Sequence, residues 1–570
     1  MRVTLVGLNG RYTHSCMALF YVRNELVENS SKIHSEILQF TINDSYYQIL
    51  MRLGATRADY YFFSAAIWNN DLTVKIVVDL LKINPECYVV IGGPQAEIVG
   101  TGVNDRRCTV VVGEIEGVAK DFYRDLRKKT LKSRYASKRV GNAFSFPYVE
   151  ADFATHLQNR HIYYESSRGC PFSCTYCLSS SQKGVFHKDL EQVRDELAEI
   201  LKHNPKVVRF VDRTFNDNGA RALAIWQFLA EQQVQTLFHF EISPSHFTEE
   251  MFSFLQELPI GKFQFEIGIQ STNPETLKAI RRPINTRAAH DIISRLSELG
   301  NIHLHVDLIL GLPFETREKF LNSFRDVFAM NPHYIQMGLL KILPDTPMCH
   351  TAPEYLYSYS SAPPYSVFAN RWLSQQTMQE LYWFCECVER FLNNRYFVSL
   401  WNYLRGEGED IVAFFLDLLN ACTKDDFFQR APTQQLLCSL ILKSTIARTD
   451  RDYICELLRY DWLRCGHRFL PADLDVAEEQ QSRELKKLIY EQFRAQKRPD
   501  EHYTESMYFL KKGFIVEFSR KFMKKQGYKL DDGRLFLCFV PESEEGVFNF
   551  SRVIQFSLPP ASSGMAGIYS

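Results

Sequence analysis

The sequence predicts an α/β protein made of two successive parallel sheets followed by a mostly helical end. Short apolar runs alternate with helical patterns over residues 1–125, and the same alternation returns over residues 162–338. Such alternation is typical of parallel strands covered by helices. After residue 344 it stops and long helical patterns follow. We expect domains at residues 1–130, 161–344 and 345–570, with a basic linker at 131–160.

The first region is expected to form a doubly wound, Rossmann-like parallel sheet. Its candidate strands are rich in Val, Ile, Leu, Tyr or Phe, as strands buried on both faces usually are. They are Arg2–Leu8, Ser35–Thr41, Asp59–Ala65, Cys87–Gly92 and Cys108–Gly113. The basic run from Arg124 to Arg139 fits a helix end that passes into a solvated linker.

The loops after these strands meet at one edge of the predicted sheet, which is where doubly wound folds bind ligands. These loops are residues 8–15, 64–70, 92–97 and 113–117. Glycines at the strand ends let the backbone approach a ligand closely, and the helix N-termini that follow favour anionic groups. Four such loops on one edge suggest a large cofactor.

The second region is expected to form an open, partial (βα)6 barrel. Six strand–helix units are too few for a complete eight-fold barrel. The candidate strands are His161–Ser166, Lys206–Asp212, Thr236–Glu241, Phe263–Ile269, His303–Leu310 and His333–Gly338. Barrel enzymes keep their active sites at the carboxyl ends of such strands.

The last region is expected to be mainly helical with a small mixed end. The pattern Gln375–Leu392 carries apolar residues at helical spacing, which indicates a core-facing helix. Further helical patterns reach Tyr460, and short strands are expected at Gly513–Phe518 and Leu535–Val540. No motif in this region indicates a particular chemistry.

Composition narrows the class of protein. The formal net charge of −1 gives no electrostatic case for a nucleic-acid or membrane partner. No apolar run approaches the roughly 18 residues that span a bilayer. The N-terminus reads as a strand and a turn rather than a signal peptide, and most cysteines are scattered as in reduced proteins. We expect a cytoplasmic protein.

The most informative motif is the loop after the first barrel strand, where Cys170, Cys174 and Cys177 stand at C-x3-C-x2-C spacing. With 14 cysteines in 570 residues, about 0.01 such triplets are expected by chance. Three thiolates can hold three irons of a [4Fe–4S] cube and leave the fourth iron open. A zinc site would need a fourth ligand, and although His187 follows, no second cysteine pair does. The spacing favours the cluster.

This spacing, with Tyr176 before the last cysteine, resembles the radical S-adenosylmethionine (SAM) enzymes. In that family SAM chelates the open iron of the cluster. One electron from the cluster then cleaves SAM and produces a 5′-deoxyadenosyl radical. The Rossmann-like domain upstream resembles the cobalamin-dependent branch. More narrowly, L-N-x-x-Y-x-H-S, a later W-N and a GGP loop resemble a bacterial group with a C-terminal domain of unknown function. The resemblance implies a [4Fe–4S] cluster, SAM and cobalamin, and a reducing protein such as flavodoxin or ferredoxin.

The resemblance also implies cofactor-facing residues in the barrel. Phe210–Asn216 is similar to F-x-D-D-x-F-N, although Arg213 replaces an acid of that pattern. Two later segments match E-x-G-x-Q-S and D-x-I-x-G-L-P-x-E-T. An inward acid on a barrel strand can accept hydrogen bonds from a ribose or an amino group, and packing within the barrel is the alternative role. The cofactor-binding residues carried over are Tyr176, Asp212, Asn216, Glu266, Gln270, Ser271 and Asp307.

In the N-terminal domain the resemblance implies a corrin held by the four loops. The D-x-H-x-x-G motif that supplies an axial histidine in many cobalamin proteins is missing, so the lower ligand of cobalt stays open. Trp68 or a neighbour would lie against the lower corrin face, the alternative being a core anchor; His14 reads as a loop hydrogen-bond donor. The candidate corrin contacts are Asn9, Ser64, Trp68, Gly93, Glu114 and Glu116.

The leading hypothesis is a cobalamin-dependent radical SAM enzyme that methylates an unactivated carbon of a small molecule. A radical rearrangement without methyl transfer is the first alternative. RNA methylthiotransferases are the second; they need another cluster from three N-terminal cysteines. Of Cys16, Cys87 and Cys108, only Cys16 falls in a strand-end loop. The identity of the substrate does not follow from the sequence.

Overall fold

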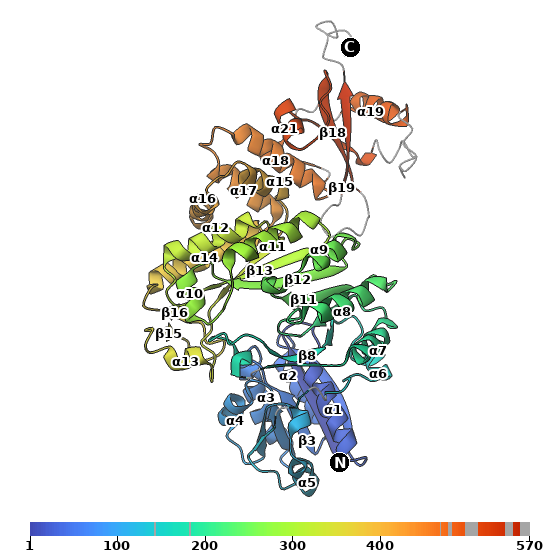
Figure 1. The fold of residues 1–570 in the computed structure, drawn as a ribbon, viewed down its shortest axis with the longest axis vertical. Helices are drawn as coiled ribbons and strands as arrows, with labels where there is room; N and C mark the ends of the chain where they lie inside the picture. The colour runs from blue at the N-terminus through green and yellow to red at the C-terminus, as the bar shows by residue number, and fades with distance from the viewer. Residues whose placement is uncertain are drawn as a thin grey trace. The chain divides into compact units, whose positions relative to one another are not determined.

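The computed structural model describes residues 1–138, 140–141, 144–181, 184–467, 469–476, 482–495, 511–541 and 551–558 (Figure 1). It divides into two compact units, Met1–Gln379 and Glu380–Ser570, which are described separately. The first unit contains both predicted parallel sheets, so the N-terminal domain and the barrel form one body. The division falls within a helix, later in the chain than the expected boundary at residue 344.

The N-terminal sheet is parallel throughout, with the strand order β2-β1-β3-β4-β5-β6. Its strands are β1 (Arg2–Asn9), β2 (His34–Thr41), β3 (Tyr60–Ser64), β4 (Tyr88–Gly92), β5 (Cys108–Val112) and β6 (Arg134–Ala136). Its helices are α1 (Met17–Asn29), α2 (Tyr46–Thr56), α3 (Asn70–Ile83), α4 (Ala96–Val103) and α5 (Lys120–Lys128). The doubly wound prediction is confirmed, and β6 extends the sheet into the segment for which only a linker was expected.

Each face of this sheet has its own apolar core. Ile49, Ile76 and Val99, from α2, α3 and α4, belong to one buried cluster together with Phe63 of β3. The next residue of the same strand, Phe62, points the other way and contacts Phe122 of α5. Successive side chains of a strand face opposite sides, so an uninterrupted apolar run is what a strand covered on both faces requires.

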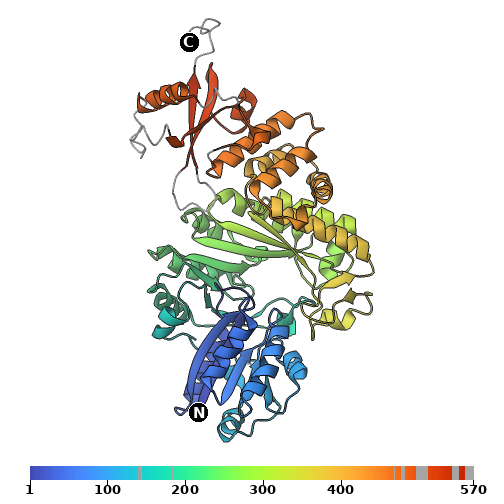
Figure 2. The ribbon, with the colours of Figure 1, turned by 180° about the vertical axis from the view of Figure 1, so that it is seen from behind.

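The second sheet is the open barrel, with the parallel order β14-β13-β12-β11-β10-β7. Figure 2 shows its strands in green, side by side. The strands are β7 (Ile162–Tyr164), β10 (Val207–Phe210), β11 (Leu237–Ile242), β12 (Phe263–Gln270), β13 (His303–Leu310) and β14 (Tyr334–Leu339). The helices are α7 (Leu190–Leu201), α8 (Gly219–Glu231), α9 (Glu249–Gln256), α10 (Pro274–Ala279), α11 (Thr286–Leu299) and α12 (Arg317–Ala329). The predicted six-unit partial barrel is confirmed.

The inner face of the barrel is polar. In β12 and β13 buried and half-buried residues alternate without interruption. The buried set is apolar, whereas the half-buried set of β12 consists of Gln264, Glu266, Gly268 and Gln270. A polar row on the inner face of a parallel strand costs desolvation unless it meets water or a ligand. The barrel interior is therefore a site for polar ligands rather than a packed core.

The loops of the N-terminal sheet contact both edges of the open barrel. On one edge His14 Nδ1 is hydrogen-bonded to the hydroxyl of Tyr163 in β7, and Ser15 Oγ donates to the carbonyl of His161 at 3.2 Å. On the other edge Tyr365, in the segment that pairs with the chain just after β14, donates to Gln95 Oε1 at 2.9 Å. The loops at residues 8–15 and 92–97 therefore reach the two edges of the open side of the barrel.

Smaller elements complete the first unit. The hairpin β8 (Ser167–Cys170) and β9 (Gly184–His187) follows β7 and frames the cysteine loop. The remaining elements are α6 (Glu150–Thr155), α13 (Pro347–Thr351), β15 (Ser358–Tyr359) and β16 (Val367–Ala369). The helix α14 (Gln375–Phe391) crosses the division between the units.

The second unit is helical and ends in a small antiparallel sheet. Its helices are α15 (Val398–Gly406), α16 (Ile411–Lys424), α17 (Gln434–Ser444), α18 (Arg451–Arg464), α19 (Arg483–Ala495) and α21 (Arg520–Lys525). Its strands are β17 (Phe514–Glu517), β18 (Arg534–Pro541) and β19 (Ser551–Leu558), in that order. The expected mixed end is confirmed, with β19 as an additional strand. Within the described residues no helix is both long and apolar enough to cross a membrane.

Gly93 is required by the loop after β4. Its φ of +95° suits glycine, and a Cβ added there would lie 2.5 Å from the carbonyl oxygen of Ala65. We expect Gly93→Ala to lower stability by about 1–3 kcal/mol, measured as a lower thermal midpoint. Gly10→Ala is the matched control, because no atom lies within 4 Å of a Cβ at Gly10. Equal midpoints for the two variants would contradict the expectation.

Candidate cofactor site at the barrel mouth

The three cysteines of the motif line one cavity at the carboxyl ends of the barrel strands. Cys174 is buried, while Cys170 and Cys177 are half-buried. The cavity has a volume of about 180 Å³. Besides the cysteines it is lined by Phe172, Tyr176, Ser179, Arg213, Thr214, Glu241, Ile242, Ser243, Glu266, Gly268, Gln270, Arg282 and Asp307.

The spacing of the sulfur atoms does not suit a single metal ion. A tetrahedral zinc site with Zn–S bonds of about 2.3 Å brings its sulfurs to about 3.8 Å from one another. Among the described residues, the three cysteines do not form a group whose ligand atoms all lie within 4.8 Å of one another. Each thiolate can instead bind a different iron of a cubane cluster.

Backbone hydrogen bonds hold the cysteine loop from two sides. The amide of Thr175 donates to the carbonyl of Ile280 at 3.0 Å, beyond α10. The carbonyl of Thr175 accepts from the amide of Met348 at 2.8 Å, in α13. The loop is therefore shaped by two distant segments of the barrel as well as by its own sequence.

Arg282 places a positive charge beside the cysteines. Its Nη1 lies 3.7 Å from Cys174 Sγ, its Nε donates to the carbonyl of Gly268 at 2.9 Å, and its guanidinium lies over the ring of Phe172. A cation next to a thiolate favours the ionised, metal-binding form. Arg282 thus joins the cysteine loop to the end of β12.

The end of β12 is locally irregular. The pairing of β12 with β13 shifts register between Gly268 and Gln270, and Gln270 has a φ of +71°. A Cβ at Gly268 would lie 2.3 Å from Gln270 Nε2 and 3.3 Å from Arg282 Nη2. Such bulges redirect a side chain next to binding sites. Here the bulge accompanies the placement of Gln270 on the cavity.

Three acids on the cavity have different protonation tendencies. A hydrogen bond of 3.0 Å from His239 lowers the pKa of Glu266. Burial raises the pKa of Glu241 to about 7, and burial with the nearby charges of Glu266 and Glu241 raises that of Asp307 well above its usual value. Carboxyl groups whose pKa values differ in this way can supply both hydrogen-bond acceptors and hydrogen-bond donors at neutral pH.

Unpartnered polar atoms indicate where a ligand fits. Asp307 Oδ1 and Gln270 Oε1 are buried and lack a hydrogen-bond partner. Buried polar atoms in proteins are normally satisfied, so these oxygens suit a ligand that donates hydrogen bonds, such as an amino group or a ribose hydroxyl. Together with the cysteines, they form a donor set that fits a cluster with a polar ligand on its open iron.

The sequence comparison agrees with this geometry. The profile described as "Radical SAM superfamily" matches residues 164–327. Residues 164–327 belong to the radical SAM superfamily. A second profile, described as "Protein of unknown function (DUF4080)", matches residues 353–531.

Curated relatives match about a third of the chain. An uncharacterised methyltransferase of Pyrococcus horikoshii is 27% identical over 184 residues, 32% of this chain and 39% of that protein. The cobalamin-dependent radical SAM methyltransferase TokK of Streptomyces tokunonensis is 27% identical over 34% of this chain and 30% of its own. The ribosomal protein uS12 methylthiotransferase RimO of Protochlamydia amoebophila is 24% identical over 36% of this chain and 44% of its own. The chain spans less than half the length of each.

Solved structures resemble a larger part of the chain. OxsB, a cobalamin-dependent SAM radical enzyme with aqua-cobalamin bound, matches with a TM-score of 0.56 and 14% identity over 81% of this chain and 80% of that one. TsrM from Kitasatospora setae, with cobalamin and a [4Fe–4S] cluster bound, matches with a TM-score of 0.50 and 16% identity over 63% and 76%. The chain thus carries a radical SAM domain at residues 164–327 and has a fold similar to that of these solved cobalamin-dependent enzymes.

Several predicted residues lie on the cavity of the radical SAM domain. They are Cys170, Cys174, Tyr176, Cys177, Glu266, Gln270 and Asp307. The sequence reasoning missed Glu241 and Arg282 and set Arg213 aside. Glu241 ends the predicted strand Thr236–Glu241, at the edge where barrel enzymes bind ligands, so its position was a usable signal. Arg282 follows a short helix and no local pattern marks it.

Asp212 is hydrogen-bonded to the residues that precede the cysteine loop. Its carboxylate accepts hydrogen bonds from the amide and hydroxyl of Ser166, at 3.0 and 2.6 Å, and from the hydroxyl of Ser167 at 2.6 Å. It is buried and does not line the cavity. Asp212 fixes the chain just before Cys170, and its contact with a cofactor stays a prediction.

Asn216 and Ser271 are also bonded to neighbouring segments. The amide of Asn216 exchanges two hydrogen bonds of 2.8 Å with the backbone of Ser243, which lines the cavity. Ser271 Oγ donates to Glu315 Oε1 at 2.5 Å. Both residues orient strand ends at the barrel mouth, and their contact with a cofactor likewise stays a prediction.

The helices of the N-terminal domain and those of the barrel differ in how their N-termini are capped. At none of the described helices α1 to α5 does a side chain cap the N-terminus. In the barrel, side chains cap α7, α8, α9, α11 and α12. Uncapped first-turn amides need another acceptor. At the ligand-binding edge, a polar or anionic cofactor group can provide it.

Trp68 is exposed rather than anchored in a core. Its side chain is 58% accessible, and its Nε1 donates to the carbonyl of Leu8 at 3.1 Å. This hydrogen bond fixes the indole at the ligand-binding edge and rules out the alternative role as a core anchor. An exposed, oriented aromatic face suits contact with a flat ligand.

Asn9 and Ser64 are held in place at the same edge. Asn9 is buried and donates to Gln39 Oε1 at 3.1 Å. The carbonyl of Ser64 accepts from Asn69 Nδ2 at 3.0 Å. Both end strands of the sheet, as predicted, and with Gly93 they shape the edge; their contact with a corrin stays a prediction.

Glu114 and Glu116 bind Arg168 of the radical SAM domain. Arg168 lies 2.7 Å from Glu116, 3.4 Å from Glu114 and 3.0 Å from Glu165. Its guanidinium also lies over the ring of Phe144, and burial raises the pKa of Glu165 to about 7. The two glutamates therefore join the N-terminal loop to the chain just before Cys170, a role that the sequence did not indicate.

We expect Arg168→Met to lower stability by about 3–5 kcal/mol, because the half-buried carboxylates of Glu114, Glu116 and Glu165 lose a buried cation. Burial raises the pKa of Glu165, and the loss of Arg168 removes the charge that opposes this rise, so the stability of the variant falls as pH increases through that pKa. The urea midpoint at pH 5.5 and pH 8 measures both effects. The control is Arg194→Met, since Arg194 forms an exposed pair with Glu191. A loss independent of pH would contradict this reasoning.

Proposed function

We propose that the protein is a cobalamin-dependent radical SAM enzyme that methylates a carbon of a small molecule. The observation that carries the proposal is the three-cysteine loop at a barrel mouth, beside unpartnered Asp307 and Gln270 and within the fold of cobalamin-dependent enzymes. When bound, the cluster and SAM supply a 5′-deoxyadenosyl radical, and the corrin supplies a methyl group. Cys170, Cys174 and Cys177 would hold the cluster.

The residues around the cysteines have distinct tasks in this proposal. Glu266, kept ionised by His239, accepts a hydrogen bond from the amino group or the ribose of SAM. Glu241 and Asp307 take up protons more readily and can donate to a carboxylate or carbonyl oxygen. Arg282 balances negative charge at Cys174.

The interior of the barrel supports a small polar substrate. Arg209 Nη2 lies 3.1 Å from His239 Nε2, which in turn lies 3.0 Å from Glu266 Oε2, so a polar row extends inward from the cavity. The substrate would lie between this row and the N-terminal loops, which face the open side of the barrel.

The methylthiotransferase relatives suggest a second function, which the cysteines argue against. That function needs three N-terminal cysteines around one cluster. Cys16 follows β1 at the carboxyl edge of the sheet, whereas Cys87 and Cys108 stand at the amino ends of β4 and β5. Burial also raises the pKa of Cys87 to about 11 and that of Cys108 to about 12. Cysteines on opposite edges cannot share one cluster.

Reconstitution without oxygen tests the proposal. We expect about four irons per chain and, with cobalamin, SAM and a small-molecule extract, both 5′-deoxyadenosine and S-adenosylhomocysteine beside a methylated product. Replacing Cys170, Cys174 and Cys177 by Ala should remove the iron and SAM cleavage, because the cluster loses its ligands. Cys455→Ala, in the helical unit, is the control. About eight irons would favour a methylthiotransferase, and 5′-deoxyadenosine without S-adenosylhomocysteine would favour a rearrangement.

Trp68 provides a separate test of the corrin site. After gel filtration we expect the Trp68→Ala variant to hold about one tenth or less of the cobalamin that wild type holds, because the corrin loses a large aromatic contact. Trp68→Phe should retain most of it. Ile83→Ala is the control, since Ile83 is exposed at the far end of α3. Equal retention by all four proteins would contradict a role for Trp68.

A further inference from the structure

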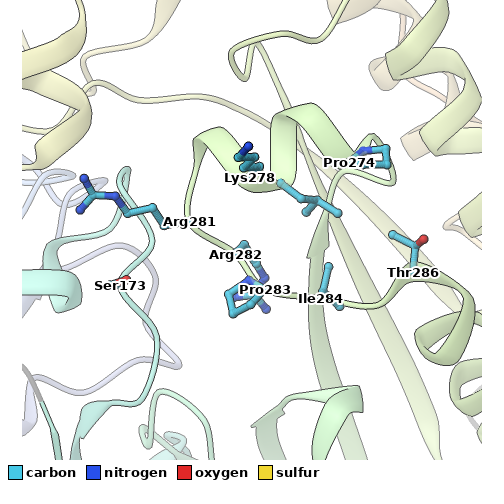
Figure 3. Close-up of a pocket in the computed structure, with 9 residues that line it drawn as sticks. Ser173, Pro274, Lys278, Arg281, Arg282, Pro283, Ile284 and Thr286 are labelled. Atoms are coloured by element: carbon cyan, nitrogen blue, oxygen red, sulfur yellow. The ribbon is translucent and has the colours of Figure 1, made fainter.

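A second, larger hollow lies beside the cysteine loop. Its volume is about 560 Å³, and Figure 3 shows the residues around it. Ser173, between two of the cysteines, contributes one part of the wall. The other lining residues come from α10 and the turn that follows it: Pro274, Leu277, Lys278, Arg281, Arg282, Pro283, Ile284 and Thr286.

The hollow is basic. Lys278, Arg281 and Arg282 line it, and none of its described lining residues is acidic. Lys278 and Arg281 are exposed, and neither forms an ion pair with a carboxylate of the described residues. The acid on the same helix, Glu275, is neutralised by Lys319 at 2.6 Å. Exposed, unpaired charges of one sign in a concave surface attract a partner of the opposite charge.

The hollow is separated from the cavity of the three cysteines by the side chain of Arg282. Arg282 lines both cavities, and its Nη1 lies 3.7 Å from Cys174 Sγ. The hydrogen bond from Thr175 to Ile280 joins the cysteine loop to the wall of the hollow. A redox group seated here would therefore approach the cluster closely, without entering the cavity that holds SAM.

We propose that this basic hollow is the docking site of an acidic, low-potential electron-carrier protein. The inference rests on the proposed function, because a cluster that cleaves SAM must gain one electron from outside the protein. In this step the reduced carrier loses one electron and the cluster gains it, and no bond forms or breaks. Electrostatic complementarity over a small interface gives the fast, transient association that electron transfer needs.

Binding of a reduced flavodoxin to the reconstituted protein tests the site directly. We expect Lys278→Glu combined with Arg281→Glu to weaken the Kd at least about tenfold, and the wild-type Kd to weaken as salt increases. The control is Lys120→Glu combined with Lys128→Glu on α5, which changes the net charge equally. Its Kd should stay within about twofold of wild type. Equal Kd values for both double variants, or no binding to wild type, would overturn the proposal.

The source of electrons separates docking from catalysis. With flavodoxin as reductant, SAM cleavage by the Lys278→Glu, Arg281→Glu variant should fall by about tenfold or more. With dithionite, which needs no docking site, its rate should equal that of wild type. An equal loss with both reductants would overturn the docking site. If dithionite-reduced wild type cleaves no SAM, the proposed function fails, and the Kd comparison still decides whether the hollow binds the carrier.

Discussion

A buried cation joins the two sheets of the first unit. Arg168 stands two positions before the first cysteine of the motif, and its charge is compensated by Glu114 and Glu116 from one domain and by Glu165 from the other. A buried charge is tolerated only when it is paired and hydrogen-bonded. The contact therefore fixes where the N-terminal loop lies relative to the cysteine loop. In the proposed function, the placement of the two cofactor sites relative to each other would depend on this contact.

The barrel shows a second constraint, between packing and binding. Its strands bury apolar residues toward the helices and turn polar residues inward, as the alternation in β12 and β13 shows. A closed barrel of eight strands fills its interior with packed side chains. An open barrel of six strands with a polar lining does not need to fill its interior with packed side chains. Its interior can therefore hold ligands. The N-terminal loops, which contact both edges of the opening, supply the missing wall.

The sequence was informative where the pattern is local. Apolar runs bounded by turns predicted every strand of both large sheets except β6, and the cysteine spacing predicted a group of three cysteines that lines one cavity. β6 was missed because Arg134–Ala136 is short and stands in a basic run. Glu114, Glu116 and Arg282 could not be assigned because their partners, Arg168 and Cys174, are distant in sequence. Such pairs follow from the topology of the chain. The hydrophobic periodicity of a single sequence carries no information about that topology.

The hydrogen bonds on both sides of Thr175 have a consequence for maturation. Because Ile280 and Met348 hold the backbone of Thr175, this part of the cysteine loop is fixed by hydrogen bonds that need no metal. Iron and sulfide can then be inserted into a protein that is already folded, and a cluster destroyed by oxygen leaves its scaffold intact. The same polypeptide can be repaired by new iron and sulfide rather than replaced, which is an economy for a protein of 570 residues.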